Sequence, residues 1–106
     1  MNRLTSSFWV QAYIKKLNLL GVPAFVVSHG DDTAGAIIVK VNKLNGDAVL
    51  FERSFSLDKN LNQWSKFESG DEKELDKLLS RQLSRDRDLW IVEIESREGD
   101  PFLDDI

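Results

Sequence analysis

Residues 35–55 read GAIIVKVNKLNGDAVLFERSF, and this stretch decides the fold. Two runs rich in valine, isoleucine and phenylalanine flank Asn45-Gly46. This dipeptide is typical of a tight β-hairpin, because both central residues of a type I′ turn need a positive φ that asparagine and glycine tolerate. We therefore predict a strand over Gly35–Leu44 and an antiparallel partner strand over Asp47–Phe55.

The predicted hairpin is apolar on both faces. If the loop has two residues, Leu44 faces Asp47, and that pair sets the register of both strands. The first face then carries mainly aliphatic side chains, namely Ile37, Val39, Val41, Ala48 and Leu50. The second face carries Ala36, Ile38, Leu44, Val49, Phe51 and Phe55, with Lys40 and Arg53 among them. Since a sheet wetted on one side alternates apolar with polar residues, we expect that neither face simply meets water.

Residues 7–20 are predicted to form a helix with an unusually wide apolar surface. Hydroxyl side chains at Thr5, Ser6 and Ser7 offer N-caps, and Gly21 supplies a helix end. At about 100° per residue the apolar side chains spread over roughly 240°. A surface helix needs an apolar stripe of only about 100°. We therefore expect this helix to be covered on two sides.

The remaining elements complete an α+β fold. Residues 24–28 and 89–96 are rich in β-branched and aromatic side chains and predict two strands. The polar stretch 56–70 predicts an irregular loop or a short edge strand, and Asp71 begins a second predicted helix over 71–86. The predicted fold is thus an antiparallel or mixed sheet of four to five strands with two helices, at least partly on one face. Its order is α-β-β-β-(β)-α-β.

The composition is that of one small globular domain. The chain has 106 residues, 42% of them hydrophobic and 30% charged, so we expect a single domain over 1–106. The net charge of −4 argues against binding to nucleic acid, which needs a basic surface, and against an anionic membrane surface. Because the sequence has no cysteine, it has no disulfide, thiol nucleophile or cysteine-ligated metal.

The sequence has no feature of a targeting signal or a membrane anchor. Phe8–Ile14 is apolar, but it contains Gln11 and runs into Lys15 and Lys16 without a small-residue cleavage site. No apolar run approaches the roughly 18 residues of a membrane helix. We therefore expect a cytoplasmic protein that does not bind membranes.

Side chains that could carry chemistry are few. The lone histidine, His29, lies in a predicted turn beside Asp31 and Asp32, where it could move protons or hold a metal. The simpler interpretation is a solvated turn, since nothing local completes a metal site. Glu93 and Glu95 share one strand face, and a solvated strand end accounts for them. We predict no catalytic, cofactor-binding or metal residues.

Three segments together resemble a known family. They are RLTSSFWV at 3–10, AGAIIVKVNKLNG at 34–46 and DLWIVEIE at 88–95. The sequence is similar there to domain-of-unknown-function family 1491, a family of short alphaproteobacterial proteins. The resemblance implies a bacterial cytoplasmic protein with a small self-contained fold, and it implies no activity. Arg87 and Ser96 stand where the family pattern has proline and aspartate, so no role is carried onto these positions.

The leading functional hypothesis is a non-enzymatic interaction or structural domain that buries apolar surface against a second copy of itself or another protein. Large uncovered apolar patches on single chains usually mark contact surfaces. The candidate interface residues are Ile38, Phe51, Arg53, Trp64 and Trp9. A competing explanation for the same pattern is that the two helices and the C-terminal tail cover both sheet faces within one chain.

The alternative hypothesis is a small ligand-binding protein or enzyme. It predicts a concave polar pocket where several of four residues converge, namely His29, Lys40, Arg53 and Glu93. If these residues lie on separate surfaces, the hypothesis loses its basis.

Overall fold

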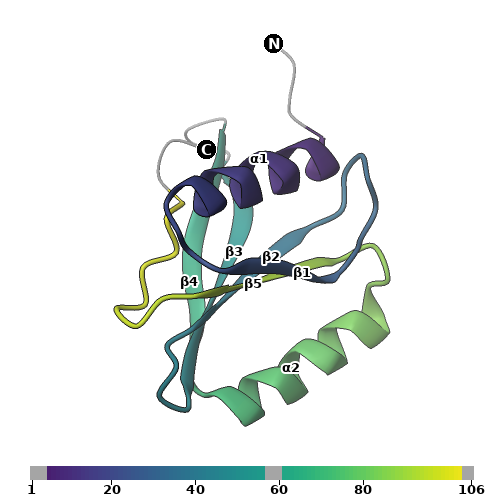
Figure 1. The fold of residues 1–106 in the computed structure, drawn as a ribbon. Helices are drawn as coiled ribbons and strands as arrows, with labels where there is room; N and C mark the ends of the chain where they lie inside the picture. Colours follow the sequence, from purple (N-terminus) through teal and green to yellow (C-terminus); the bar gives the residue numbers. More distant parts are fainter. Residues whose placement is uncertain (1–4, 57–60, 104–106) are drawn as a thin grey trace.

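The protein is a five-stranded mixed sheet between two helices (Figure 1). The computed structural model describes residues 5–56 and 61–103. In chain order the elements are α1 (Ser6–Leu19), β1 (Ala24–Ser28), β2 (Ile37–Asn42), β3 (Asp47–Ser56), β4 (Leu61–Asp71), α2 (Glu72–Arg85) and β5 (Trp90–Glu95). The strand order is β1-β5-β2-β3-β4. The predicted α+β class, the two helices and the element order are confirmed, and the polar stretch proves to contain the edge strand β4.

The sheet is mixed because β5 returns to its centre. β5 pairs in parallel with β2 and antiparallel with β1, whereas β2–β3 and β3–β4 are antiparallel. The strands β5 and β2 lie inside the sheet, and apolar cores cover both of their faces. Their burial is nearly continuous along the chain rather than alternating, as expected for strands that are sandwiched between helices.

The two helices lie on opposite faces of the sheet, whereas the sequence predicts them at least partly on one face (Figure 1). One core packs α1 against the sheet through Trp9, Tyr13 and Leu17, which meet the side chains of Val39 and Val92. The second core packs α2 against the other face and contains Ile38, Ala48, Leu50, Leu75, Leu79, Leu89 and Ile91. The apolar hairpin is thus covered on both faces within a single chain.

The register of the hairpin differs by one residue from the prediction. Val41 pairs with Val49, and the Lys43 amide donates to the Asp47 carbonyl at 3.0 Å, so the loop has three residues. Leu44, the first of them, adopts φ 64°. A leucine in the left-handed region is uncommon, which is why the two-residue loop was the simpler expectation.

Side-chain hydrogen bonds explain how the three-residue loop is held. The Leu44 amide donates to Asn42 Oδ1 at 2.8 Å, and the Asp47 amide donates to Asn45 Oδ1 at 3.0 Å. Both are the local asparagine contacts that stabilise turns.

A one-residue shift moves every side chain of one strand to the other face. Val49 and Phe51 therefore lie with Val39 on the α1 face, while Ala48 and Leu50 lie with Ile38 on the α2 face. The side chain of Phe55 lies outside the described residues.

Both helices begin at the caps that the sequence predicts. Thr5 Oγ1 accepts from the Phe8 amide at 3.2 Å, and Asp71 Oδ2 accepts from the Glu74 amide at 3.1 Å. Ser6 Oγ then donates to the Gly35 carbonyl at 2.6 Å, in a buried contact. This bond fixes the start of α1 against the loop that leads into β2.

The segment after β5 folds back against α1. Tyr13 Oη donates to the Pro101 carbonyl at 2.6 Å, and Lys16 Nζ donates to the Phe102 carbonyl at 3.2 Å. Burial, with a smaller effect from the charge of Asp100, raises the pKa of the Tyr13 phenol above its ordinary value, so this hydroxyl remains a donor. Phe102 and Leu103 pack against the α1 core.

Candidate functional site

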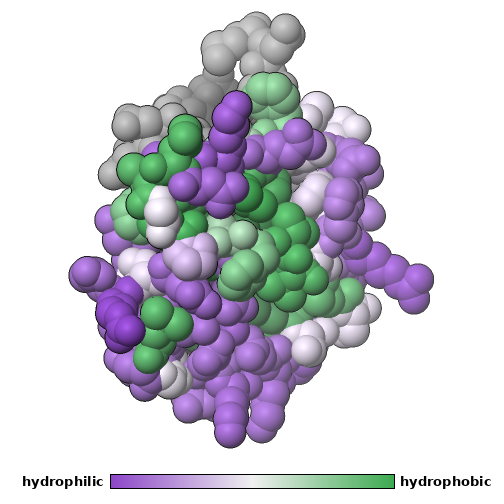
Figure 2. All heavy atoms as spheres, viewed as in Figure 1, coloured by the Kyte–Doolittle hydropathy of each residue, from purple (hydrophilic) through white to green (hydrophobic). Residues whose placement is uncertain are grey.

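Among the sheet residues whose side chains the structure describes, the most exposed apolar ones lie on the edge strand β1. Phe25, Val26 and Val27 are 45%, 40% and 56% exposed, and no residue of Ala24–Ser28 is charged. Figure 2 shows hydrophobic side chains gathered across the middle of the face where β1 lies, between α1 and α2. Exposed edge strands are usually protected by charge, proline or cover. β1 has neither charge nor proline within its length.

The backbone of β1 presents hydrogen-bonding groups to its free edge. The Glu95 amide donates to the Pro23 carbonyl at 3.1 Å, and Phe25 lies opposite Glu93. In an antiparallel pair the residues alternate between those bonded to the neighbour and those that point away. Phe25 is therefore bonded toward β5, whereas the amide and carbonyl of Val26 point outward. A register shift between Val26 and Ser28 ends this regular pairing.

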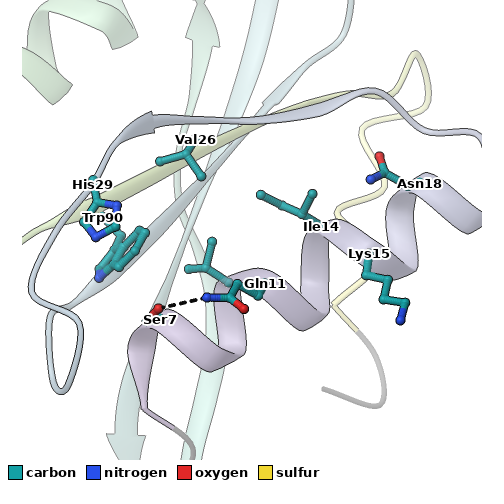
Figure 3. Close-up of a pocket in the computed structure, with 9 residues that line it drawn as sticks. Ser7, Gln11, Ile14, Lys15, Asn18, Val26, His29 and Trp90 are labelled. Carbon is teal, nitrogen blue, oxygen red and sulfur yellow. Dashed lines mark hydrogen bonds between the residues drawn. The ribbon is translucent and has the colours of Figure 1, made fainter.

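A groove of about 390 Å³ lies between β1 and α1. It is lined by Ser7, Val10, Gln11, Ile14, Lys15, Asn18, Val26, His29 and Trp90. In Figure 3, Ile14 and Val26 approach the groove from opposite walls, and His29 and Trp90 lie at one end. The polar side chains of the lining come mostly from α1, which also contributes Val10 and Ile14, while Val26 and Trp90 add apolar surface from the sheet.

His29 belongs to this groove as part of an aromatic cap. Its ring lies on Trp90 with the centroids 4.1 Å apart, and His29 Nε2 is 2.8 Å from Asp32 Oδ1. Trp90 Nε1 donates to the Asp31 carbonyl at 2.8 Å. His29 and Asp32 are both largely exposed, so the pair is solvated. This geometry matches the turn interpretation of His29.

The loop that carries His29 is held tightly against the chain before β5. The Asp31 amide donates to the Asp88 carbonyl at 3.0 Å. A Cβ at Gly30 or at Gly35 would collide with that same carbonyl oxygen. These two glycines are therefore required for a close backbone approach.

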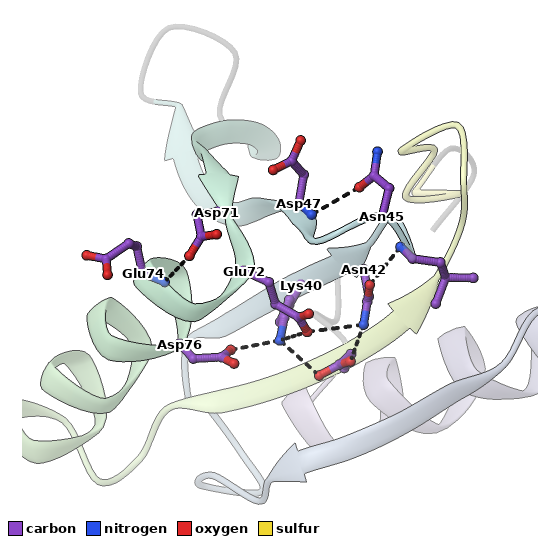
Figure 4. A network of polar contacts seen from close by, with 10 residues as sticks. Lys40, Asn42, Asn45, Asp47, Asp71, Glu72, Glu74 and Asp76 are labelled. Carbon is purple, nitrogen blue, oxygen red and sulfur yellow. Dashed lines mark hydrogen bonds and ion pairs between the residues drawn. The ribbon is translucent and has the colours of Figure 1, made fainter.

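A buried lysine forms the principal polar cluster of the other sheet face (Figure 4). Lys40 is 3% exposed. Its Nζ lies 2.8 Å from Glu72 Oε2, 2.7 Å from Asp76 Oδ1 and 3.3 Å from Glu93 Oε1. Asn42 Nδ2 joins by donating to Glu72 and Glu93 at 3.1 and 3.3 Å. The cluster ties the first turns of α2 to β2 and β5.

The electrostatics of this cluster do not favour a nucleophilic role for Lys40. Burial lowers the pKa of the ammonium, but the hydrogen bonds to Asp76 and Glu72 and the charge of Glu93 outweigh burial and hold the pKa above its ordinary value. A nucleophilic lysine needs a lowered pKa. Lys40 is thus a cation at neutral pH and neutralises part of the surrounding negative charge.

The polar pocket predicted from four residues does not form. Lys40 and Glu93 do meet, on the α2 face. His29 lies instead in the groove beside α1. The Arg53 guanidinium carbon lies 5.9 Å from the ring centroid of Trp9, which is in the α1 core. The four side chains therefore occupy three separate places.

Two of the five predicted interface residues are internal. Trp9 and Ile38 are 1% and 5% exposed, so neither is available for contact at the surface of a single chain. Trp64 lies against Trp9 with ring centroids 5.0 Å apart, and Phe51 packs on the same core. With Arg53 they are half-buried. The candidate residues do not include β1, although its apolar sequence without a charged residue is the pattern that could have indicated an open sheet edge.

The described residues hold no group of three or more histidine and acidic side chains placed to bind a metal. In the same part of the chain, no helix has the length and apolarity to cross a membrane.

Fold and site together define a small α+β domain whose mixed sheet lies between two helices and leaves one apolar edge open. A family model described as a protein of unknown function, DUF1491, matches residues 4–104. The chain belongs to the DUF1491 family, which confirms the resemblance.

Solved structures of relatives share this fold. The crystal structure of a DUF1491 family protein from Caulobacter crescentus CB15 is 38% identical with a TM-score of 0.86, over 96% of each chain. An NMR structure of a DUF1491 family protein from the same bacterium is 37% identical with a TM-score of 0.81, over 97% of this chain and 96% of that one. Protein Atu0922 from A. tumefaciens is 29% identical with a TM-score of 0.75, over 90% and 87%. No curated protein matches the sequence.

Proposed function

We propose that this protein is a non-enzymatic interaction domain that pairs with a second copy of itself along the free edge of β1. The observation that carries the proposal is the state of that edge: three consecutive exposed apolar side chains, outward backbone groups at Val26 and no charge along the strand. Strand pairing satisfies the backbone groups and covers the apolar side chains in one step.

A second copy fits this edge because β1 is complementary to itself. A two-fold axis at Val26 would let its amide and carbonyl exchange hydrogen bonds with the same groups of the other chain. Phe25 of each copy would then lie opposite Val27 of the other. Although the whole chain has a net charge of −4, such a pairing opposes no like charges along the strand. The product is one continuous ten-stranded sheet, which is twice the five strands of one chain.

The hairpin no longer contributes to this proposal, because α1 and α2 cover it. The spare side of α1 contributes little, since its exposed apolar residues are separated. Phe8 lies near the start of the helix, and Leu19 and Leu20 lie at its end, where they are 59%, 81% and 56% exposed. β1 therefore carries the proposed interface.

Sedimentation equilibrium of the wild type and two lysine variants tests the proposal. The wild type should reach twice the 12.1 kDa chain mass as concentration rises. Val27→Lys should remain at the single-chain mass, because it places a charge within the paired edge. Leu19→Lys adds the same charge at a more exposed apolar site and should still dimerise. A wild type that is monomeric at millimolar concentration, or equal effects of the two variants, would contradict the proposal.

A further inference from the structure

We propose that the groove between α1 and β1 binds a small amphipathic anion, such as a medium-chain carboxylate, with its charged end at Lys15 and Asn18 and its apolar body toward Trp90. The groove has about 390 Å³, within the size range of small-molecule sites. It is formed within one chain on the α1 face, so the inference goes beyond the proposed dimer and does not depend on it.

The charge of the groove lining favours a negatively charged ligand. The chain carries 18 acidic and 14 basic residues, yet its groove is lined by no carboxylate within the described part of the structure. Lys15 is the fixed charge of the lining. Asp32 is near by, but it is paired with His29 at the opposite end. An anion at the Lys15 end is therefore attracted, whereas a cation meets no lining carboxylate there.

The arrangement of polar and apolar side chains along the groove favours an amphipathic ligand. Ser7, Gln11 and Lys15 follow one another at intervals of four residues, which places them along one side of α1. Asn18 continues this side by one further turn. The apolar contribution comes from Val10, Ile14, Val26 and Trp90. A molecule lying along the groove would therefore have a polar environment on one side and aliphatic and aromatic contacts on the other.

The polar side chains of α1 that line the groove can offer hydrogen bonds to a ligand. Within the described residues, the Gln11 amide donates to Ser7 Oγ at 3.2 Å, and both side chains lie at the edge of the groove (Figure 3). Lys15 and Asn18 are exposed. A carboxylate bound between them would receive one charge-assisted and one neutral hydrogen bond.

The test is an NMR titration of the ¹⁵N-labelled protein with sodium decanoate below its micelle concentration, compared with decyltrimethylammonium. Decanoate should shift the amide resonances of Ile14 and Val26 and the indole resonance of Trp90. It should bind about tenfold more tightly than the cation, as one charge-assisted contact allows. This preference is diagnostic, since the net charge of −4 acts in favour of the cation.

Three variants locate the site. Lys15→Gln should weaken decanoate binding roughly tenfold, while Lys73→Gln removes an exposed lysine of α2 and should change it less than twofold. Gln11→Phe should fill the groove and abolish the shifts without unfolding the protein, because position 11 is exposed. Running the titration on Val27→Lys as well separates this site from the dimer interface.

Equal affinity for the two detergents, equal effects of the two lysine variants, or shifts that avoid the groove would each overturn the inference. The absence of any shift at millimolar decanoate would do the same. None of these results bears on the dimer, which is judged by separate measurements of association.

Discussion

The two edges of the sheet are built in opposite ways. β1 has five residues, none of them charged, and three of its apolar side chains are exposed. β4 has eleven residues, including the charged residues Lys66, Glu68 and Asp71. The pairing of both edge strands contains a register shift, so charge is what distinguishes the two edges. Charge on an edge strand is one of the usual means by which proteins prevent edge-to-edge association. The difference indicates that β4 is closed to other strands and that β1 is open.

The helices repeat this asymmetry. α2 packs on β3 and β4 and is tied to the sheet by the Lys40 cluster, whereas α1 approaches β1 but leaves a groove beside it. The packing of α2 on the sheet is thus fixed by ionic and apolar contacts. The β1 edge and the groove beside it are the two surfaces for which we propose binding partners.

The largest expected effect comes from removing the lysine that ties α2 to β2 and β5. Lys40→Met leaves Glu72, Asp76 and Glu93 close together without a cation, and we expect a loss of roughly 3 kcal/mol in the free energy of unfolding. Urea denaturation measures this loss. Lys66→Met on the exposed edge is the control and should change stability by less than about 0.5 kcal/mol. Similar losses in both variants would refute the assigned role of Lys40.

Removing the two charges within β4 should reduce the difference between the two edges. The variant Lys66→Val with Glu68→Val leaves β4 uncharged up to Asp71 at its end, and a molecule with two open edges cannot close after one pairing. We expect species larger than the dimer in sedimentation velocity, in amounts that increase with concentration. If the variant stops at the dimer, the charges of β4 are not what closes that edge.

The stability contributed by Lys40 should depend on alkaline pH. Its folded pKa lies above the ordinary value of 10.5, so the contribution is complete below that value and is lost as the pH rises through the folded pKa. The difference in unfolding free energy between wild type and Lys40→Met should therefore be constant between about pH 7 and 10 and shrink above it. A difference that grows with alkaline pH would show that the cluster is wrongly described.

Only a small effect on stability is expected at β1 itself. Phe25→Thr removes an apolar side chain that is already 45% exposed, so unfolding free energy should change by less than about 1 kcal/mol. Dimerisation should nevertheless weaken by about tenfold or more, since the pairing loses an aromatic cross-strand contact. A variant that is greatly destabilised would place Phe25 in the core and not at an interface.

The periodicity of the sequence predicts the elements well because each one obeys a local rule. The N-caps at Thr5 and Asp71 and the turn at Asn45-Gly46 mark the boundaries of α1, α2 and the hairpin within about two residues. The predicted register is wrong by one residue because Leu44, a non-glycine residue, adopts a positive φ in a loop that asparagine side chains stabilise. Whether a leucine can adopt this conformation depends on those hydrogen bonds, and the residue type alone does not show it.

The site was harder to predict because it depends on which elements become neighbours. His29 was singled out as a turn residue, but its contact with Trp90 joins positions 61 residues apart in sequence. The groove exists only because α1 lies beside β1, and the sequence patterns of the two elements do not specify that placement. The uncharged strand 24–28 is the one sequence feature that indicates an interaction surface, and it does so only when the strand is known to lie at the edge of the sheet.

Hydrogen exchange at the Val26 amide tests the central claim most directly, because this group points to the free edge of β1. Pairing with a second copy predicts that its protection rises with protein concentration, while amides of β4 show no such dependence. A Val26 amide that exchanges freely at every concentration at which the protein can be studied would contradict the proposed pairing.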